Sequence, residues 1–218
     1  MEKHIIVGNG PSLNNVDHDT LFKNKNCVSF NRAFIIYEKY NFFPTYYFCI
    51  DKTVLLNCIH DIEKLFDSSI QYFILLKCNE TIQFENNKKV TLVEKNSDNS
   101  LYFGDVATFS IYYLYSNNIT RIFDIYGCDC SYIEDYTQLN VSVKYNKNDP
   151  SRRIILKPNK NSKDPNHFID TYFDSSTEYS VPRTKNHLYC WENISKLTNL
   201  GICFKTFSRA SHLFHKDD

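Results

Sequence analysis

The segment His4-Ile5-Ile6-Val7-Gly8-Asn9-Gly10-Pro11-Ser12-Leu13 tells most about how this chain folds. Its short apolar run predicts a buried strand. Two glycines and a Pro-Ser pair follow, which is how an α/β protein passes from a strand through a tight turn into a helix. Glycines let the backbone approach a ligand, and the first amides of the next helix can face an anion. We therefore predict a nucleotide or phosphate site at this turn, with a plain tight connection as the alternative.

Two well-known phosphate sites do not fit this turn. It lacks the third glycine of the dinucleotide fingerprint, and it lacks the Gly-Lys-Ser/Thr sequence of a P-loop. A nucleotide bound here would therefore be held by a different set of contacts.

Strand and helix signals alternate along the first two-thirds of the chain and return near its end. Apolar runs predict strands at 4–7, 27–30, 46–50, 72–76, 90–93, 121–126 and 202–207, and helical spacing predicts helices at 53–66, 105–115 and 185–197. This alternation predicts a doubly wound, mostly parallel α/β sheet of the Rossmann-like kind. We expect one domain over residues 1–218, in which the polar segment 131–184 forms a long lid loop or insertion.

Composition and charge argue against several classes of protein. Twenty-five Lys and Arg balance 25 Asp and Glu, so no basic face for nucleic acid is expected. No apolar stretch reaches the roughly 18 residues of a transmembrane span, and the first strand begins where a signal peptide would lie. We expect a cytoplasmic protein, with the inner membrane surface as an alternative location and a homo-oligomer as one option.

Eight cysteines lie mostly inside apolar runs, which predicts buried free thiols. The one close pair, Cys128-x-Cys130, has a spacing that suits neither a zinc site nor a thioredoxin-type redox site. The sequence therefore predicts no metal centre and no cofactor.

Polar residues follow most of the predicted strands. In an open parallel sheet, ligands bind outside the carboxyl ends of the strands, so these residues are candidate ligand contacts. Each alone could equally be a helix cap or a turn former. They are Gly8-Asn9-Gly10, Asn31-Arg32, Asp51-Lys52, Gly127-Cys128-Asp129 and Ser208-Arg209.

In order and spacing, these motifs resemble those of the bacterial sialyltransferases of glycosyltransferase family 42. They also resemble the wider relatives of that family, namely the motility-associated flagellin glycosyltransferases and the pterin-pyrophosphokinase-like proteins. The turn from Ile5 to Leu13 carries most of the likeness, which extends from residue 1 to about residue 215. The resemblance implies metal-independent, inverting transfer of a nonulosonic sugar from a CMP-activated donor to a glycan hydroxyl.

The resemblance also implies roles for individual residues. Asn9, Gly10, Ser12 and Asn31 would contact the nucleotide, and Asp51 stands where the sialyltransferases have a second asparagine. Two lid tyrosines of the family bind the departing phosphate, and Tyr132 and Tyr136 are the nearest candidates here.

The resemblance leaves the catalytic base and the phosphate-binding cation open. The family motif carries two histidines, whereas this chain reads Asn166-His167-Phe168-Ile169-Asp170-Thr171, with Thr171 at the second position. His167 or Asp170 is the candidate base, although His167 could instead order the lid. Because the region around Phe103-Gly104-Asp105 lacks the family's arginine, Arg183 or Arg209 is the candidate phosphate partner.

Two other functions stay open. On the same fold, Asp51 and Asp129 could hold Mg²⁺ against a triphosphate in a pterin or nucleotide pyrophosphokinase. The chain could also be a nucleotide-binding module without catalysis. A transferase that uses a CMP-sugar should work in EDTA, whereas a pyrophosphokinase should not.

Overall fold

The computed structural model describes residues 2–145, 154–159, 165–169, 171–172, 178–180 and 183–207. Its main element is a seven-stranded sheet in which every neighbouring pair is parallel, so the predicted α/β class is confirmed. Across the sheet the strand order is β10-β6-β1-β2-β3-β4-β5. The strands are β1 (His4–Val7), β2 (Cys27–Phe30), β3 (Tyr46–Cys49), β4 (Tyr72–Leu76), β5 (Val90–Val93), β6 (Ile122–Tyr126) and β10 (Cys203–Thr206).

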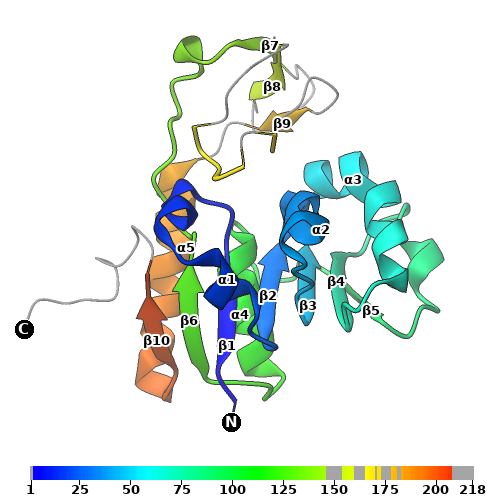
Figure 1. The fold of residues 1–218 in the computed structure, drawn as a ribbon, viewed down its shortest axis with the longest axis vertical. Coiled ribbons are helices and arrows are strands. Elements are labelled where there is room, and N and C mark those ends of the chain that lie inside the picture. Colours follow the sequence, from blue (N-terminus) through cyan, green and yellow to red (C-terminus); the bar gives the residue numbers. More distant parts are fainter. Residues whose placement is uncertain are drawn as a thin grey trace, which may run out of the picture.

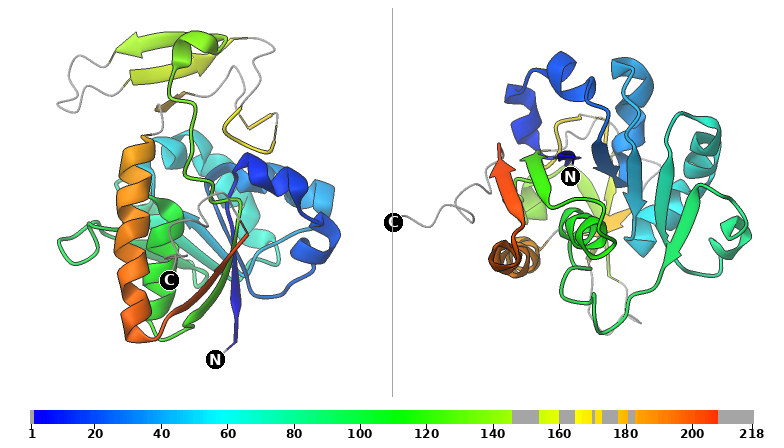
Figure 2. Two further views of the ribbon diagram at one scale, coloured as in Figure 1. Left: turned by 90° about the vertical axis from the view of Figure 1, so that its left-hand side faces the viewer. Right: turned by 90° about the horizontal axis from the view of Figure 1, so that it is seen from below.

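Helices cover both faces of this sheet (Figure 2). Alternate residues of β1 point to opposite faces: Ile6 joins one buried cluster, and Ile5 and Val7 join the other. The cluster around Ile6 includes residues of α4 (Val106–Ser116) and α5 (Thr184–Ser195). On the other face lie α1 (His18–Phe22), α2 (Tyr37–Tyr40), α3 (Lys52–Lys64) and the 3-10 turns η1 (Pro11–Asn15) and η2 (Asn31–Ile36).

The strand order reverses beside β1 (Figure 1). From β1 the chain adds β2 to β5 in one direction, and α4 then carries it back to place β6 on the other side of β1. At such a switch point, the connections that leave neighbouring strands turn to opposite faces and open a crevice. The switch point lies between the carboxyl ends of β1 and β6, next to the Gly8-Asn9-Gly10 turn.

The polar segment 131–184, which we expected to form a long lid loop or insertion, contains regular structure in the part that the structure describes. It contains a second, antiparallel sheet made of β7 (Val141–Tyr145), β8 (Ile154–Pro158) and β9 (Tyr179–Ser180), together with the short turn η5 (Tyr136–Gln138). This small sheet lies beyond the carboxyl ends of the main strands (Figure 1). The polar composition hid β7 because only part of an exposed two-sided sheet needs apolar side chains.

Three of the helices on this scaffold have an aspartate as their N-cap. Asp17, Asp51 and Asp105 are the N-caps of α1, α3 and α4, and each carboxylate accepts two backbone amides of the first turn. Such a cap satisfies amides that have no partner inside the helix.

All eight cysteines are free thiols, and six of them are buried. None of the helices in the described ranges is long and apolar enough to cross a membrane.

Candidate functional site

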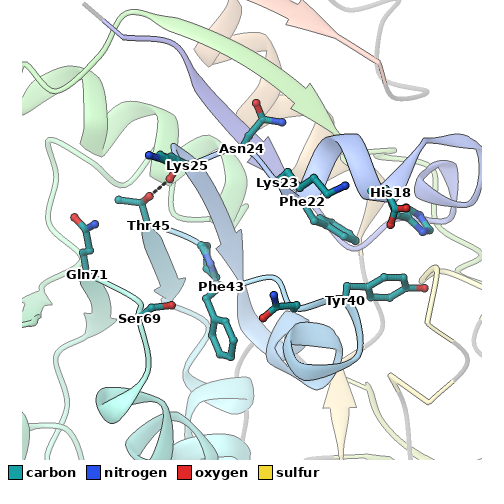
Figure 3. A pocket seen from close by; sticks show the side chains of 13 residues that line it. His18, Phe22, Lys23, Asn24, Lys25, Tyr40, Phe43, Thr45, Ser69 and Gln71 are labelled. Carbon is teal, nitrogen blue, oxygen red and sulfur yellow. Dashed lines mark hydrogen bonds between the residues drawn. The ribbon is translucent and has the colours of Figure 1, made fainter.

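Two hollows lie at opposite ends of the main sheet. The larger one, shown in Figure 3, is at the amino ends of β2 to β4, where Lys25, Thr45 and Gln71 line it together with residues of α1 and α2. Thr45 Oγ1 there donates a hydrogen bond to the carbonyl of Lys25. The second hollow, which we call the cleft, lies at the carboxyl ends of β1 and β6. It is lined by Gly8, Asn9, Gly10, Phe30, Asn31, Asp105, Val106, Ala107, Gly127, Cys128, Asp129, Cys130, Ser131, Tyr132, Asn166, His167, Tyr172 and His187.

The floor of the cleft is formed by the turns after β1 and β6, which contact each other backbone to backbone. The amide of Gly8 donates to the Tyr126 carbonyl and that of Gly10 to the Gly127 carbonyl, both at 2.8 Å. A Cβ on Gly8 would overlap the Gly127 carbonyl oxygen, and Gly127 itself has a φ of +65°. These glycines are therefore required by the packing of two strand ends, which accounts for them without a ligand.

Asp129 supports the same turn. Its Oδ2 accepts a hydrogen bond from the Ser12 amide at 2.8 Å, and a Cβ on Gly10 would overlap that oxygen. The side chain is buried, so Asp129 ties the turn after β6 to the start of η1. Its hydrogen bond to a backbone amide gives the buried Asp129 carboxylate a structural role. Asp129 also lines the cleft.

Three side-chain oxygens near this turn are buried and have no hydrogen-bond partner among the described residues. They are Asn9 Oδ1, Ser12 Oγ and Asn31 Oδ1. Buried polar atoms are nearly always paired, and leaving one unpaired costs roughly 1–3 kcal/mol. Asn9 Nδ2, by contrast, lies within hydrogen-bonding distance of the Phe30 carbonyl at 3.3 Å and the Tyr172 hydroxyl at 3.4 Å. The unpaired oxygens therefore mark where a ligand or ordered water would complete the structure.

The backbone of Asn31 explains part of its identity. Its φ of +51° is a left-handed conformation that asparagine tolerates better than most residues. Its carbonyl accepts a 2.6 Å hydrogen bond from the Tyr47 hydroxyl, which holds this bend. The side-chain amide of Asn31 takes no part in that contact, and Asn31 lines the cleft.

The opposite wall holds a buried Asp105–His187 pair that the sequence analysis missed. Asp105 Oδ2 lies 2.8 Å from His187 Nδ1 and 2.9 Å from the indole nitrogen of Trp191. Asp105 Oδ1 accepts the amide of Ala107 at 2.8 Å, so the same carboxylate also caps α4. From the sequence, Asp105 and His187 were each predicted only as part of a helix, at 105–115 and 185–197. Nothing local in the sequence links two positions 82 residues apart.

The pair changes the protonation of both partners. Burial by itself would lower the pKa of His187, but the charge and hydrogen bond of Asp105 outweigh it, and the pKa is raised. Burial would raise the pKa of Asp105, but the charge and hydrogen bond of His187, with the Ala107 and Trp191 donors, lower it. The ion pair is therefore favoured, at a position that keeps 21% of the His187 side chain exposed.

Tyr132, a candidate from the family resemblance, lies against this pair. Its ring centroid is 4.8 Å from that of His187. Burial and the nearby charge of Asp105 raise the pKa of its phenol well above the ordinary value. Tyr132 therefore presents a neutral hydroxyl, which can donate a hydrogen bond to an anion.

Residues 165–172 cover part of the cleft where the structure describes them. The Phe168 amide donates to the Asn9 carbonyl at 2.9 Å, and the buried Asn166 side chain bonds both backbone groups of Ile133. The His167 ring stacks on Tyr172 with centroids 3.7 Å apart. These contacts fit either predicted role of His167, because it both orders this cover and lines the cleft.

Several predicted site residues lie elsewhere. Asp51 is exposed and caps α3, and Tyr136 and Arg183 are not among the residues that line the cleft. Ser12 is buried behind the turn. Asp170 and Arg209 lie outside the described residues. The structure thus brings together Gly8, Asn9, Gly10, Asn31, Gly127, Asp129, Tyr132 and His167.

Comparisons of the chain with family models, with curated proteins and with solved structures give no match. The resemblance to family 42 therefore stays a prediction. Among the described residues, no three His, Cys, Asp or Glu side chains gather in a way that could hold a metal ion.

Proposed function

We propose that the cleft binds the nucleotide of an activated sugar and that the protein is a glycosyltransferase. In this proposal a nonulosonic sugar passes from a CMP-activated donor to a glycan hydroxyl with inversion. The observation that carries the proposal is the pair of unpaired buried oxygens at Asn9 and Asn31, two residues that line a switch-point crevice. Amide oxygens of this kind suit the amino and hydroxyl groups of a nucleoside.

The opposite wall suits the phosphate of such a donor. Val106 and Ala107 line the cleft at the amino end of α4, but Asp105 already accepts the Ala107 and Thr108 amides there, so a phosphate would depend on the side chains beside them. The neutral hydroxyl of Tyr132 adds a donor next to them. Sugar transfer breaks the bond between the anomeric carbon and a phosphate oxygen, so donors placed there would stabilise the charge that builds up on departing CMP.

The pyrophosphokinase alternative has weaker support. It needs Asp51 and Asp129 to share a magnesium ion, but Asp51 accepts the Thr53 and Val54 amides while Asp129 accepts the Ser12 amide. The Asp51 carboxylate is thus used as a helix cap and the Asp129 carboxylate as a turn contact. Of the two residues, only Asp129 lines the cleft.

A thermal-shift screen tests the proposal. CMP, CDP, UDP, ATP and GTP are compared in EDTA and in Mg²⁺, and we expect CMP to raise the melting temperature equally in both. Asn31→Gly should abolish that shift, because glycine keeps the left-handed backbone while removing the amide. Asn79→Ala, at an exposed position that is not among the residues lining the cleft, is the matched control.

Other outcomes of the screen point elsewhere. A shift with ATP in Mg²⁺ alone would favour the pyrophosphokinase. A CMP shift without turnover of a CMP-sugar would favour a binding module. If no nucleotide shifts the melting temperature, the proposed function is wrong.

A further inference from the structure

The proposed transfer needs a group that takes the proton from the acceptor hydroxyl, and the predicted candidates leave that role open. Thr171 stands at the position of the family's base. His167 is stacked face to face on Tyr172, in the segment that covers the cleft. On the opposite wall, His187 is the other histidine that lines the cleft.

The contacts of His187 fix which of its nitrogens can act. Nδ1 is engaged by Asp105 Oδ2, so the Asp105 contact holds the ring orientation and leaves Nε2 for the cleft. Asp105 is itself held by Trp191 and by the Ala107 amide. Trp191 is fully buried in the core between α5 and the sheet. The His187 ring is therefore held by contacts to the buried core, on a helix rather than on a loop.

Asp105 also supplies the charge that a base needs after it takes a proton. An imidazolium formed on His187 would lie 2.8 Å from that carboxylate. The other groups that act on the ring are the Asp51 and Glu134 carboxylates, which favour the protonated form, and the Tyr132 ring. Burial opposes protonation, but the pKa of His187 is raised on balance, so the neutral ring that acts as a base predominates only above that raised pKa.

We propose that His187 is the catalytic base of the cleft and that Asp105 and Trp191 are its positioning residues; this inference rests on the proposed glycosyl transfer. The acceptor hydroxyl gives its proton to Nε2 of neutral His187, and the oxygen's electron pair forms the bond to the anomeric carbon. The bond from that carbon to the phosphate oxygen breaks, and its electrons leave with CMP. The proton later passes from His187 to solvent.

The test uses CMP-N-acetylneuraminic acid as the probe, with water and lactose as acceptors, and measures release of CMP by the full chain. We expect His187→Gln to lower the rate by about 10²–10⁴-fold, as for loss of a general base, while the CMP thermal shift remains. His60→Gln, on the exposed side of α3, is the matched control and should keep the wild-type rate.

A pH profile separates a base from a merely structural histidine. The wild-type rate should rise with pH as His187 loses its proton. In Asp105→Asn this rise should move to lower pH, because the charge that raises the pKa of His187 is gone. A histidine that only supports the fold would change the rate without moving the profile. This comparison also serves if His187→Gln does not fold.

The outcomes distinguish the two proposals. If the wild type releases CMP and His187→Gln does so at the same rate, or if His167→Gln takes the whole loss, His187 is not the base while the transferase proposal stands. If the wild type neither binds CMP nor turns over the probe, the transferase proposal fails and this inference fails with it.

Discussion

Replacing Asp105 by alanine should destabilise the protein far more than the same change at Asp51. Both aspartates are N-caps of long helices, and each accepts two first-turn amides at similar distances. They differ in their surroundings: Asp51 is exposed, whereas Asp105 is 7% exposed and also accepts from His187 and Trp191. The pair of variants therefore separates the cap from the buried network.

The expected magnitudes follow from these contacts. Loss of an aspartate cap costs about 1 kcal/mol, which is the whole expected effect at Asp51. At Asp105 the indole N–H of Trp191 would also be left buried without a partner, which adds about 1–3 kcal/mol. His187 loses its partner too, but water in the cleft can reach its ring. We expect a total of about 2–4 kcal/mol from the lost cap and the unpaired indole together.

Urea unfolding at pH 7 measures both values. Trp191 is the one tryptophan of the chain and donates to Asp105, so its fluorescence reports directly on this part of the core. We expect the two losses in unfolding free energy to differ by about 1–3 kcal/mol, with unchanged m-values. Losses that agree within about 0.5 kcal/mol would refute the reasoning, because the network would then add nothing to the cap.

Two further expectations concern pH and the strand-end turns. Since the folded pKa of His187 is raised, the stability that its charged form contributes is complete below about pH 6.5 and is lost as pH rises through the folded pKa. The unfolding free energy of the wild type should therefore fall more between pH 6 and 9 than that of His187→Gln. Parallel curves of unfolding free energy against pH for the two proteins would contradict this. Gly8→Ala should cost about 3 kcal/mol or more by urea unfolding, since the new methyl would overlap the Gly127 backbone. Gly201→Ala, where nothing lies within 4 Å of a Cβ, should cost only the roughly 1–2 kcal/mol of its left-handed backbone, and equal losses would argue against the packing explanation.

Much of the fold could be predicted because it depends on neighbours along the chain. The apolar runs at 4–7, 27–30 and 72–76 are strands with the predicted bounds, and α4 begins after Asp105. The antiparallel sheet was not predicted as a sheet, because β7 is mostly exposed and the pairing of β7, β8 and β9 leaves no local pattern in the sequence.

The candidate site divides in the same way. Asn9, Asn31 and Asp129 were predicted from their places after strands and Tyr132 from the family resemblance, and all four line the cleft. Asp51 carries the same signal but does not line the cleft, since a polar residue after a strand can equally cap a helix. Local spacing cannot separate these cases.

The sequence by itself determined the alternation of buried strands and capped helices, because periodicity, caps and turns act over a few residues. Only the tertiary structure decided that β6 lies beside β1, that Gly8 needs the Gly127 turn, and that Asp105 meets His187. Those contacts depend on how crossovers order the strands and on which helices then lie side by side. Packing of residues far apart in the chain, rather than any local pattern, therefore built the wall of the cleft that we propose to be catalytic.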